Sequence, residues 1–265
     1  MPPGDTIAIV TDTLDPGRQP HRRVHLPLAA AGLLAILPAC SPQPPGASQR
    51  WASQDNWLAN GSFESGREPW TSLASTSPFW RDFSISDTVA RSGRHSAKLA
   101  LDSRQRNDQG TWVWGVVRDL PTDRLPRTLS GSYRVQGWKQ GARHQYLQVV
   151  VSLTPAPGRG FPVFETGSEA PLQVAWVLGG IDRQPFEIGN RKFVFLGPLE
   201  VPQDRWVDFT IDLPAAFQES WGFLPEGFAS LRVLFEARYD QWQPDQGEVS
   251  GDVFFDDLYL GELPP

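Results

Sequence analysis

The chain has 265 residues, of which 40% are hydrophobic and 20% are charged, the balance of an ordinary globular protein. The formal net charge of −6 gives no support for a nucleic-acid partner. The length allows one domain of about 200 residues and an additional tail. The 11 tryptophans are an excess that suits either a core or an aromatic binding surface.

The first predicted element is a signal peptide over residues 1–39. Arg22 and Arg23 precede a short apolar run, too short and proline-interrupted for a membrane-spanning helix. The run ends in LPAC, which resembles the lipobox of bacterial lipoproteins and implies that Cys40 is lipidated. The alternative is a buried free cysteine, but polar, proline-rich sequence follows at once. Residues 1–20 carry aspartates that suit a signal peptide badly, so we hypothesise a later translation start.

Residues 40–55 are rich in proline, serine and glutamine and cannot bury enough apolar surface to fold, which predicts a flexible tether. From residue 56 to residue 262, short runs of alternating apolar and polar residues are separated by turn residues. About ten such strand candidates occur, with at most one short helical turn in 214–228. The pattern predicts an all-β fold, a single β-sandwich jelly roll.

The closing strand, GDVFFDDLYL, has apolar residues on both faces and two carboxylates in its middle. Strict alternation places Phe254, Asp256, Leu258 and Leu260 on one face. A buried ionised carboxylate is costly unless it is paired or binds a metal. We therefore expect Asp256 or Asp257 to meet a partner from the other end of the domain.

Three segments then resemble a known family when taken in order: LANGSFESGREPW, ARSGRHSAKLAL and VFFDDLYL. They look like the jelly-roll carbohydrate-binding modules for cellulose, xylan and related glucans. In that group an N-x-x-F-E-x-G-x-x-x-W segment opens the domain, an S-G-x-x-S turn follows, and a D-D strand closes it. The resemblance covers residues 56–262. It implies a galactose-binding-like β-sandwich and a polysaccharide or oligosaccharide partner.

The same resemblance implies a structural Ca²⁺ ion where the first and last strands meet. Its ligands would include Glu64 from the F-E segment, with Asp256 or Asp257 from the D-D strand. Calcium takes about six to eight oxygen ligands, and clustered carboxylates would otherwise repel one another. The alternative is that these carboxylates accept hydrogen bonds from loop N–H groups or pair with an arginine such as Arg94.

In the resembled modules the ligand lies on a concave sheet or at the loops of one edge. Alternate polar side chains on otherwise core-like strands predict a polar row on one sheet face that suits a hydroxylated or acidic glycan, formed by Arg134, Gln148, Glu236 and Arg238. The alternative is a solvated sheet face. The insertion over residues 155–190 is expected to wall one side of a groove. Trp112 and Trp114 share one face of their strand and are either a stacking platform or half of the core. The candidate ligand-binding residues are Trp112, Trp114, Arg134, Tyr146, Gln148, Glu236 and Arg238.

The sequence therefore predicts a membrane-anchored, non-catalytic carbohydrate-binding lipoprotein of the bacterial cell envelope. Ser41 after the cysteine favours the outer membrane where one exists. If the chain is instead an enzyme that degrades glycans on a jelly-roll scaffold, Glu236 is the best single catalytic candidate. A structural or adhesive protein that binds a protein partner, and an accessory subunit of polysaccharide export or uptake, are the remaining alternatives.

Overall fold

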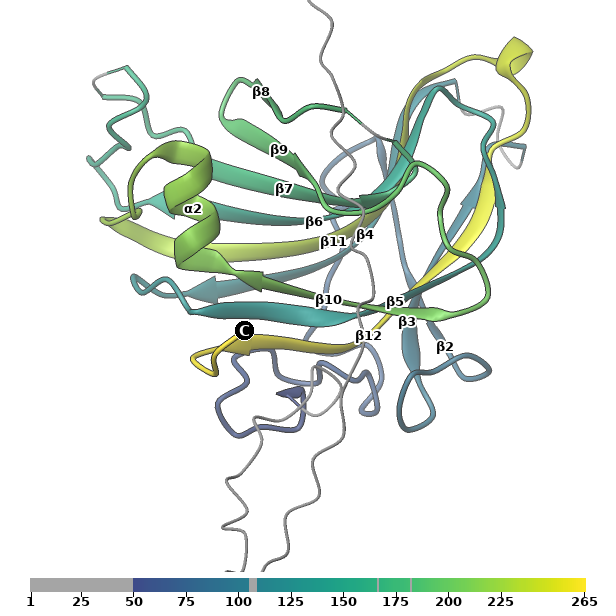
Figure 1. The fold of residues 1–265 in the computed structure, drawn as a ribbon, viewed down its shortest axis with the longest axis horizontal. Coiled ribbons are helices and arrows are strands. Elements are labelled where there is room, and N and C mark those ends of the chain that lie inside the picture. Colours follow the sequence, from purple (N-terminus) through teal and green to yellow (C-terminus); the bar gives the residue numbers. More distant parts are fainter. Residues whose placement is uncertain (1–49, 105–108, 166, 182) are drawn as a thin grey trace, which may run out of the picture. The chain divides into compact units, whose positions relative to one another are not determined.

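The computed structural model describes residues 50–104, 109–165, 167–181 and 183–265. In this part of the chain two β-sheets face one another across a hydrophobic core, which confirms the predicted β-sandwich jelly roll (Figure 1). The predicted signal peptide, the lipidation site Cys40 and most of the predicted tether lie outside the described residues.

The first sheet has seven strands, and two of its neighbouring strand pairs are parallel. Its edge strands β1 and β8 have only two and three residues. In spatial order the strands are β1 (Trp80–Arg81), β4 (Gly110–Pro121), β11 (Phe228–Trp242), β6 (His144–Pro155), β7 (Leu172–Gly179), β9 (Arg191–Phe195) and β8 (Phe186–Ile188).

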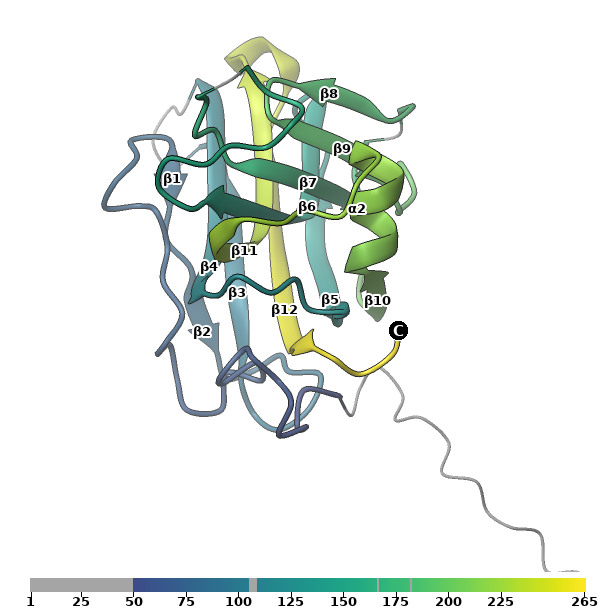
Figure 2. The same ribbon diagram turned by 90° about the vertical axis from the view of Figure 1, so that its left-hand side faces the viewer.

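The second sheet has five strands and is antiparallel throughout. In Figure 2 its long strands β3, β5 and β12 run across the direction of β6, β7 and β9. In spatial order the strands are β10 (Trp206–Asp212), β5 (Thr128–Lys139), β12 (Ser250–Gly261), β3 (Ser96–Asp102) and β2 (Ser84–Ser86).

The core lies between the two sheets and follows the predicted alternation. Leu147, Val149 and Val151 of β6 are fully buried and face the five-stranded sheet, as period-2 patterning requires. Phe235 of β11 and Phe255 of β12 join the two sheets, with ring centroids 5.4 Å apart. Aromatic burial of this kind supplies much of the stability of such a domain.

One helix, α2 (Leu213–Trp221), follows β10 and replaces the predicted short helical turn. The Asp212 side chain caps its first turn by accepting a hydrogen bond from the Ala215 N–H at 3.1 Å. Gly222, with φ 82°, ends it. The described part of the chain contains no helix whose length and apolar composition would allow a membrane crossing.

The closing strand β12 corrects the predicted assignment of its faces. Asp257 has φ 53°, and the pairing with β5 shifts register between Asp256 and Tyr259, which marks a β-bulge. An extra residue in the strand reverses the alternation. Phe255 therefore faces the core before the bulge and Leu258 after it. The prediction that Phe254, Asp256, Leu258 and Leu260 share one face is wrong for this reason.

The opening segment of the domain is attached to the end of β12. The Trp57 N–H donates to the Leu260 carbonyl at 2.8 Å, and the Leu258 N–H donates to the Gly61 carbonyl at 2.9 Å. The Asn56 amide bridges the same region, donating to the Leu258 carbonyl at 2.9 Å and accepting from the Leu260 N–H at 3.1 Å. The two ends of the domain therefore lie side by side, as predicted.

Candidate functional site

A groove lies on the outer face of the seven-stranded sheet, opposite the core. Even-numbered side chains of β6 and of the stretch 232–238 in β11 point to this face because their odd-numbered neighbours fill the core. Two cavities of about 470 and 600 Å³ lie along it. Both cavities are lined by Thr111, Arg191 and Arg238, so they form one continuous groove.

Charged and polar side chains form the floor of the groove. Gln148 and Glu236 stand directly opposite one another on β6 and β11, and Gln148 Nε2 donates to Glu236 Oε2 at 2.6 Å. Glu236 is 1% exposed and Gln148 is fully buried. The guanidinium Nη1 of Arg238 lies 3.6 Å from Glu236 Oε2 and balances its charge.

The floor continues from Arg238 to Asp240 and Tyr146. Arg238 donates to Asp240 Oδ1 from Nε at 3.1 Å and from Nη2 at 2.5 Å, and the Tyr146 hydroxyl donates to Asp240 Oδ2 at 2.9 Å. Burial would lower the pKa of Arg238, but Tyr146, Glu236 and Asp240 together raise it, so the guanidinium stays charged. Burial raises the pKa of Tyr146, so its hydroxyl keeps its proton.

Trp80 forms one side of the groove. It lies on β1, paired with Val113 of β4, and its ring rests on Gly115. A Cβ atom at Gly115 would lie 2.2 Å from the Trp80 ring, so only glycine lets the indole approach the sheet this closely. The neighbouring Phe79 is 57% exposed and lines the same cavity.

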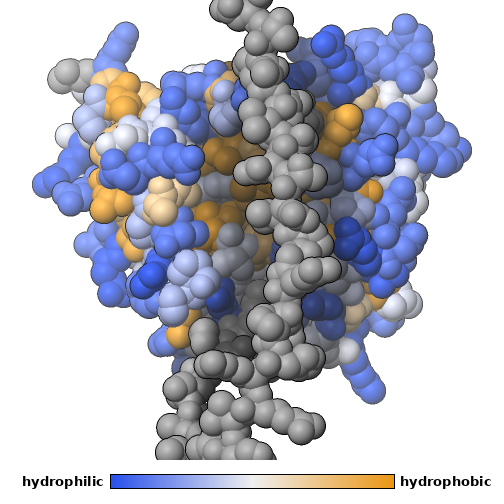
Figure 3. Space-filling view, viewed as in Figure 1, coloured by the Kyte–Doolittle hydropathy of each residue, from blue (hydrophilic) through white to orange (hydrophobic). Residues whose placement is uncertain are grey.

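The β8–β9 hairpin forms the other side. Phe186 and Phe193 stack with ring centroids 4.7 Å apart and an interplanar angle of 12°, and both line the groove. Because Phe186 belongs to the 155–190 segment, that segment does wall one side of the groove, as expected. Figure 3 shows hydrophobic residues toward the middle of one face of the molecule and hydrophilic residues around its margin.

Four of the seven predicted ligand-binding residues meet on this floor, namely Tyr146, Gln148, Glu236 and Arg238. Arg134 does not, because it lies on β5 of the five-stranded sheet, where it pairs with Trp206 of β10. The prediction that Arg134 shares a sheet face with Gln148, Glu236 and Arg238 is therefore wrong. Alternation within one strand cannot tell which of the two sheets the strand will join.

The paired tryptophans belong to the core side of the seven-stranded sheet. Trp114 is 6% exposed, and its ring centroid lies 5.8 Å from that of Tyr239. Trp112 is partly buried against the same core, with the Arg81 guanidinium 3.5 Å from its ring centroid. Of the two alternatives left open by the sequence, the core is correct, and a stacking platform at Trp112 and Trp114 is wrong.

Sequence reasoning missed several residues of the groove. Arg191 and Phe193 share the outer face of β9, and the alternation of RKFVF could have placed them together. Phe186 lies at a strand end, where no periodic signal exists. Asp240 continues the alternation of Glu236 and Arg238 along β11, so extending that pattern by one step could have found it. Trp80 lies on a strand of two residues, too short for any pattern to reveal its orientation.

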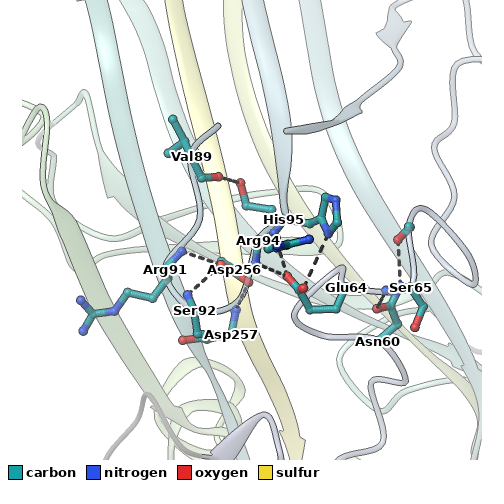
Figure 4. A network of polar contacts seen from close by, with 12 residues as sticks. Asn60, Glu64, Ser65, Val89, Arg91, Ser92, Arg94, His95, Asp256 and Asp257 are labelled. Carbon is teal, nitrogen blue, oxygen red and sulfur yellow. Dashed lines mark hydrogen bonds and ion pairs between the residues drawn. The ribbon is translucent and has the colours of Figure 1, made fainter. Parts of the chain in front are cut away.

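The acidic residue of the opening segment, Glu64, contacts the loop over residues 91–95 (Figure 4). Glu64 Oε1 accepts hydrogen bonds from the N–H groups of Arg94 at 2.8 Å and His95 at 2.7 Å. Gly93 has φ 61°, and a Cβ atom there would lie 2.5 Å from the Glu64 carboxyl carbon. The loop therefore needs glycine at this position to close over the carboxylate.

Asp256 and Asp257 contact the same loop from β12 (Figure 4). Asp256 Oδ2 accepts hydrogen bonds from the N–H groups of Arg91 at 2.7 Å and Ser92 at 3.4 Å. The Ser92 hydroxyl donates to Asp257 Oδ1 at 2.5 Å. The alternative in which loop N–H groups satisfy the carboxylates is therefore present in the structure.

The pKa values of Asp256 and Asp257 are raised, whereas the pKa of Glu64 is lowered. Burial raises the pKa of Asp256 to about 7, helped by the Asp257 charge and opposed by the N–H groups of Arg91 and Ser92. Burial also raises the pKa of Asp257. For Glu64 burial acts the same way, but the hydrogen bonds from loop N–H groups outweigh it and lower the pKa.

The cluster fits a calcium ion only in part. Asp257 Oδ2 is buried without a hydrogen-bond partner among the described residues, and the charge of nearby Glu64 helps to raise the pKa of Asp257. Oxygen donors of this kind suit Ca²⁺. Among the described residues, however, no three His, Cys, Asp or Glu side chains converge to hold a metal. Main-chain carbonyls or water would have to supply the remaining ligands.

The fold and the groove together define a β-sandwich jelly roll with a polar, aromatic-walled groove on one sheet. No protein-family model and no curated protein matches the sequence. Similar solved structures include the TmCBM61 module in complex with β-1,4-galactotriose (12% identity, 78% of this chain, 98% of that chain, TM-score 0.37). They also include a CBM22 xylan-binding domain from Paenibacillus barcinonensis (13% identity, 77% of this chain, 93% of that chain, TM-score 0.36). A third is the CBM28 module specific for non-crystalline cellulose (11% identity, 77% of this chain, 93% of that chain, TM-score 0.38).

Proposed function

We propose that this protein is a lipid-anchored, non-catalytic component of the bacterial cell envelope that binds a polysaccharide or oligosaccharide in its groove. The observation that carries the proposal is the groove itself, with Trp80 on one side, Phe186 and Phe193 on the other, and buried hydrogen-bonding groups beneath. Sugar rings offer C–H faces that pack against aromatic rings and hydroxyls that pair with polar side chains.

Binding without cleavage is favoured by the state of the groove carboxylates. Glu236 is 1% exposed and accepts a hydrogen bond from Gln148, and Asp240 accepts hydrogen bonds from Arg238 and Tyr146. A general acid or base must reach the glycosidic oxygen or a water molecule. Carboxylates held in this way serve better as part of a rigid floor. Release of reducing ends from a bound polysaccharide would contradict this part of the proposal.

Replacing Trp80 with alanine is expected to weaken glycan binding tenfold or more, about 1.4 kcal/mol, because an aromatic wall is lost from the groove. Gly115→Ala should weaken binding in the same direction, since the new methyl group would displace the indole without removing it. The measurement is affinity electrophoresis of the full chain in gels that contain soluble glucans, xylans or galactans.

Trp206→Ala is the matched control for this experiment. Trp206 pairs with Arg134 in the five-stranded sheet, away from the groove, so its replacement should leave glycan retention unchanged. Equal loss of retention in Trp80→Ala and Trp206→Ala would argue against the groove. Retention of no glycan, with capture of an envelope protein, would favour the structural or adhesive alternative.

We also propose that Cys40 carries the lipid and that the outer membrane, where there is one, is the destination. The lipobox-like LPAC sequence and the serine at position 41 support this proposal. Cys40→Ser should move the protein from the membrane fraction to the soluble fraction, as measured by immunoblotting after fractionation. A serine variant that still sediments with membranes would count against lipidation.

A structural calcium ion at the carboxylate cluster completes the proposal. It is supported by the orphaned Asp257 Oδ2 and by the nearness of Glu64 to the same loop. The ion would neutralise carboxyls that burial otherwise forces toward the protonated form.

A further inference from the structure

The groove carries more positive charge than its own carboxylates neutralise, although the chain as a whole has a net charge of −6. The lining contains more guanidinium groups than carboxylates. Its arginines are Arg183, Arg191, Arg232 and Arg238, and its carboxylates are Glu236 and Asp240.

Two of these arginines are neutralised by protein carboxylates. Arg238 contacts Glu236 and Asp240 on the floor. Arg232 makes a forked pair with Asp119, from Nε to Oδ1 at 2.6 Å and from Nη2 to Oδ2 at 3.0 Å. The charges of Arg232 and Asp119 cancel, whereas Arg238 with Glu236 and Asp240 leaves one net negative charge on the floor. A net positive charge in the groove therefore depends on the two remaining arginines, Arg183 and Arg191.

Arg191 has no such neutralising partner. Its Nε donates to the neutral Gln173 Oε1 at 2.7 Å, which fixes the direction of the side chain. No carboxylate forms an ion pair with it in the part of the chain that the structure describes. It lines both cavities, so its charge lies at the junction of the groove, 5.9 Å from the Phe193 ring centroid.

Arg183 adds positive charge at the β8 end of the groove. It contacts His144 Nε2 and lies 6.0 Å from the Phe186 ring centroid, and no described carboxylate pairs with it. Burial and the charges of Arg183 and Arg143 lower the pKa of His144, so the imidazole is neutral at neutral pH and can accept the hydrogen bond.

We propose that the groove selects glycans that carry carboxylate groups, that is, uronic-acid polysaccharides, and that Arg191 and Arg183 bind those carboxylates. This inference rests on the proposed function and names its ligand class. A guanidinium matches a carboxylate through two parallel N–H···O bonds, and the surrounding aromatic rings reduce competition from water. Sulfated glycans share the negative charge but not this planar geometry, and the test separates them.

The experiment measures binding of the full chain to three polymers by affinity electrophoresis and calorimetry. Polygalacturonate carries the carboxylates, its methyl ester has the same backbone without charge, and dextran sulfate carries sulfate instead. We expect polygalacturonate to bind about tenfold more tightly than the methyl ester, as suits a charge-assisted bidentate contact. Dextran sulfate should bind more weakly than polygalacturonate.

Arg191→Gln should reduce the tenfold preference for polygalacturonate to nearly none, and Arg191→Lys should retain part of it because the charge remains without the fork. Arg134→Gln is the matched control, since it removes one positive charge from the other sheet and should keep the preference. Unchanged melting temperatures of the variants would show that the fold is intact.

The outcomes distinguish this inference from the proposed function. Equal binding of polygalacturonate and its methyl ester overturns the anionic class but leaves glycan binding in place. Tightest binding to dextran sulfate, lowered equally by Arg134→Gln and Arg191→Gln, identifies unspecific polyanion attraction and also overturns it. Failure to bind any charged or neutral glycan overturns both proposals.

Discussion

Replacing Arg238 with methionine is expected to lower the free energy of unfolding by about 3–5 kcal/mol, because it leaves buried carboxylates uncompensated. Glu236 is 1% exposed and would lose its nearest positive charge, 3.6 Å away. Asp240 would lose the guanidinium donor at 2.5 Å. Urea unfolding followed by tryptophan fluorescence measures the effect.

Two further variants isolate the cause of this loss. Adding Glu236→Gln to Arg238→Met should restore part of the lost stability, since the amide needs no counter-charge. Arg232→Met removes an arginine from an exposed pair with Asp119 and should cost less than about 1 kcal/mol. If Arg238→Met costs no more than Arg232→Met, the floor is not held together by buried charge.

The second large effect concerns the carboxylate cluster and is expected to depend on both calcium and pH. In the metal-free protein the pKa of Asp256 is about 7, whereas an unfolded aspartate titrates near about 3.9. Between these values the folded state binds more protons than the unfolded state. The free energy of unfolding therefore falls as pH rises through this window, by about 4 kcal/mol at most.

Calcium should reverse this loss because it binds the ionised carboxylates. With calcium at about 100 times its Kd, the gain is about 2.7 kcal/mol, or roughly 5–10 °C in Tm. We therefore expect EDTA to lower the Tm at pH 7.5 and to have little effect at pH 5, where Asp256 is protonated. Scanning calorimetry with and without EDTA at the two pH values is the measurement.

Asp256→Asn is the control, since it cannot ionise. The variant should lose both the response to EDTA and most of the fall in stability between pH 5 and 7.5. A wild-type Tm that EDTA does not change at pH 7.5 would mean that no calcium binds. Hydrogen bonds from Arg91 and Ser92 would then hold the carboxylates unaided.

The fold could be predicted from the sequence because apolar and polar residues alternate along its long strands. In β6 and in the stretch 231–239 of β11, the odd-numbered residues lie in the core and the even-numbered residues outside it, as the pattern predicts. The alternation fails at the bulge in β12, where Asp257 takes a positive φ, and at the two ends of β11, where the register shifts and Phe228 and Trp242 enter the core. Nothing in the pair of aspartates announces an extra residue in the strand.

The residues of the groove could be predicted from the sequence only in part. Strand phase placed Gln148, Glu236 and Arg238 on a common outward side, but it could not tell that Arg134 belongs to the opposite sheet. The tryptophans show the same limit, because the sequence around Trp80 and around Trp176 does not tell which of them is buried in the core. One lines the groove and the other is 2% exposed in the core. Which tryptophan lies in the groove and which in the core depends on contacts between strands that are distant in the sequence.

The short edge strands matter if the protein is concentrated on a membrane by the proposed lipid anchor. A long, flat edge strand offers unpaired N–H and C=O groups on which a strand of another molecule can align and begin aggregation. Strands β1, β8 and β2 have only two, three and three residues, so three of the four lateral margins offer little to such a neighbour. Crowded copies can therefore lie next to one another without fusing their sheets.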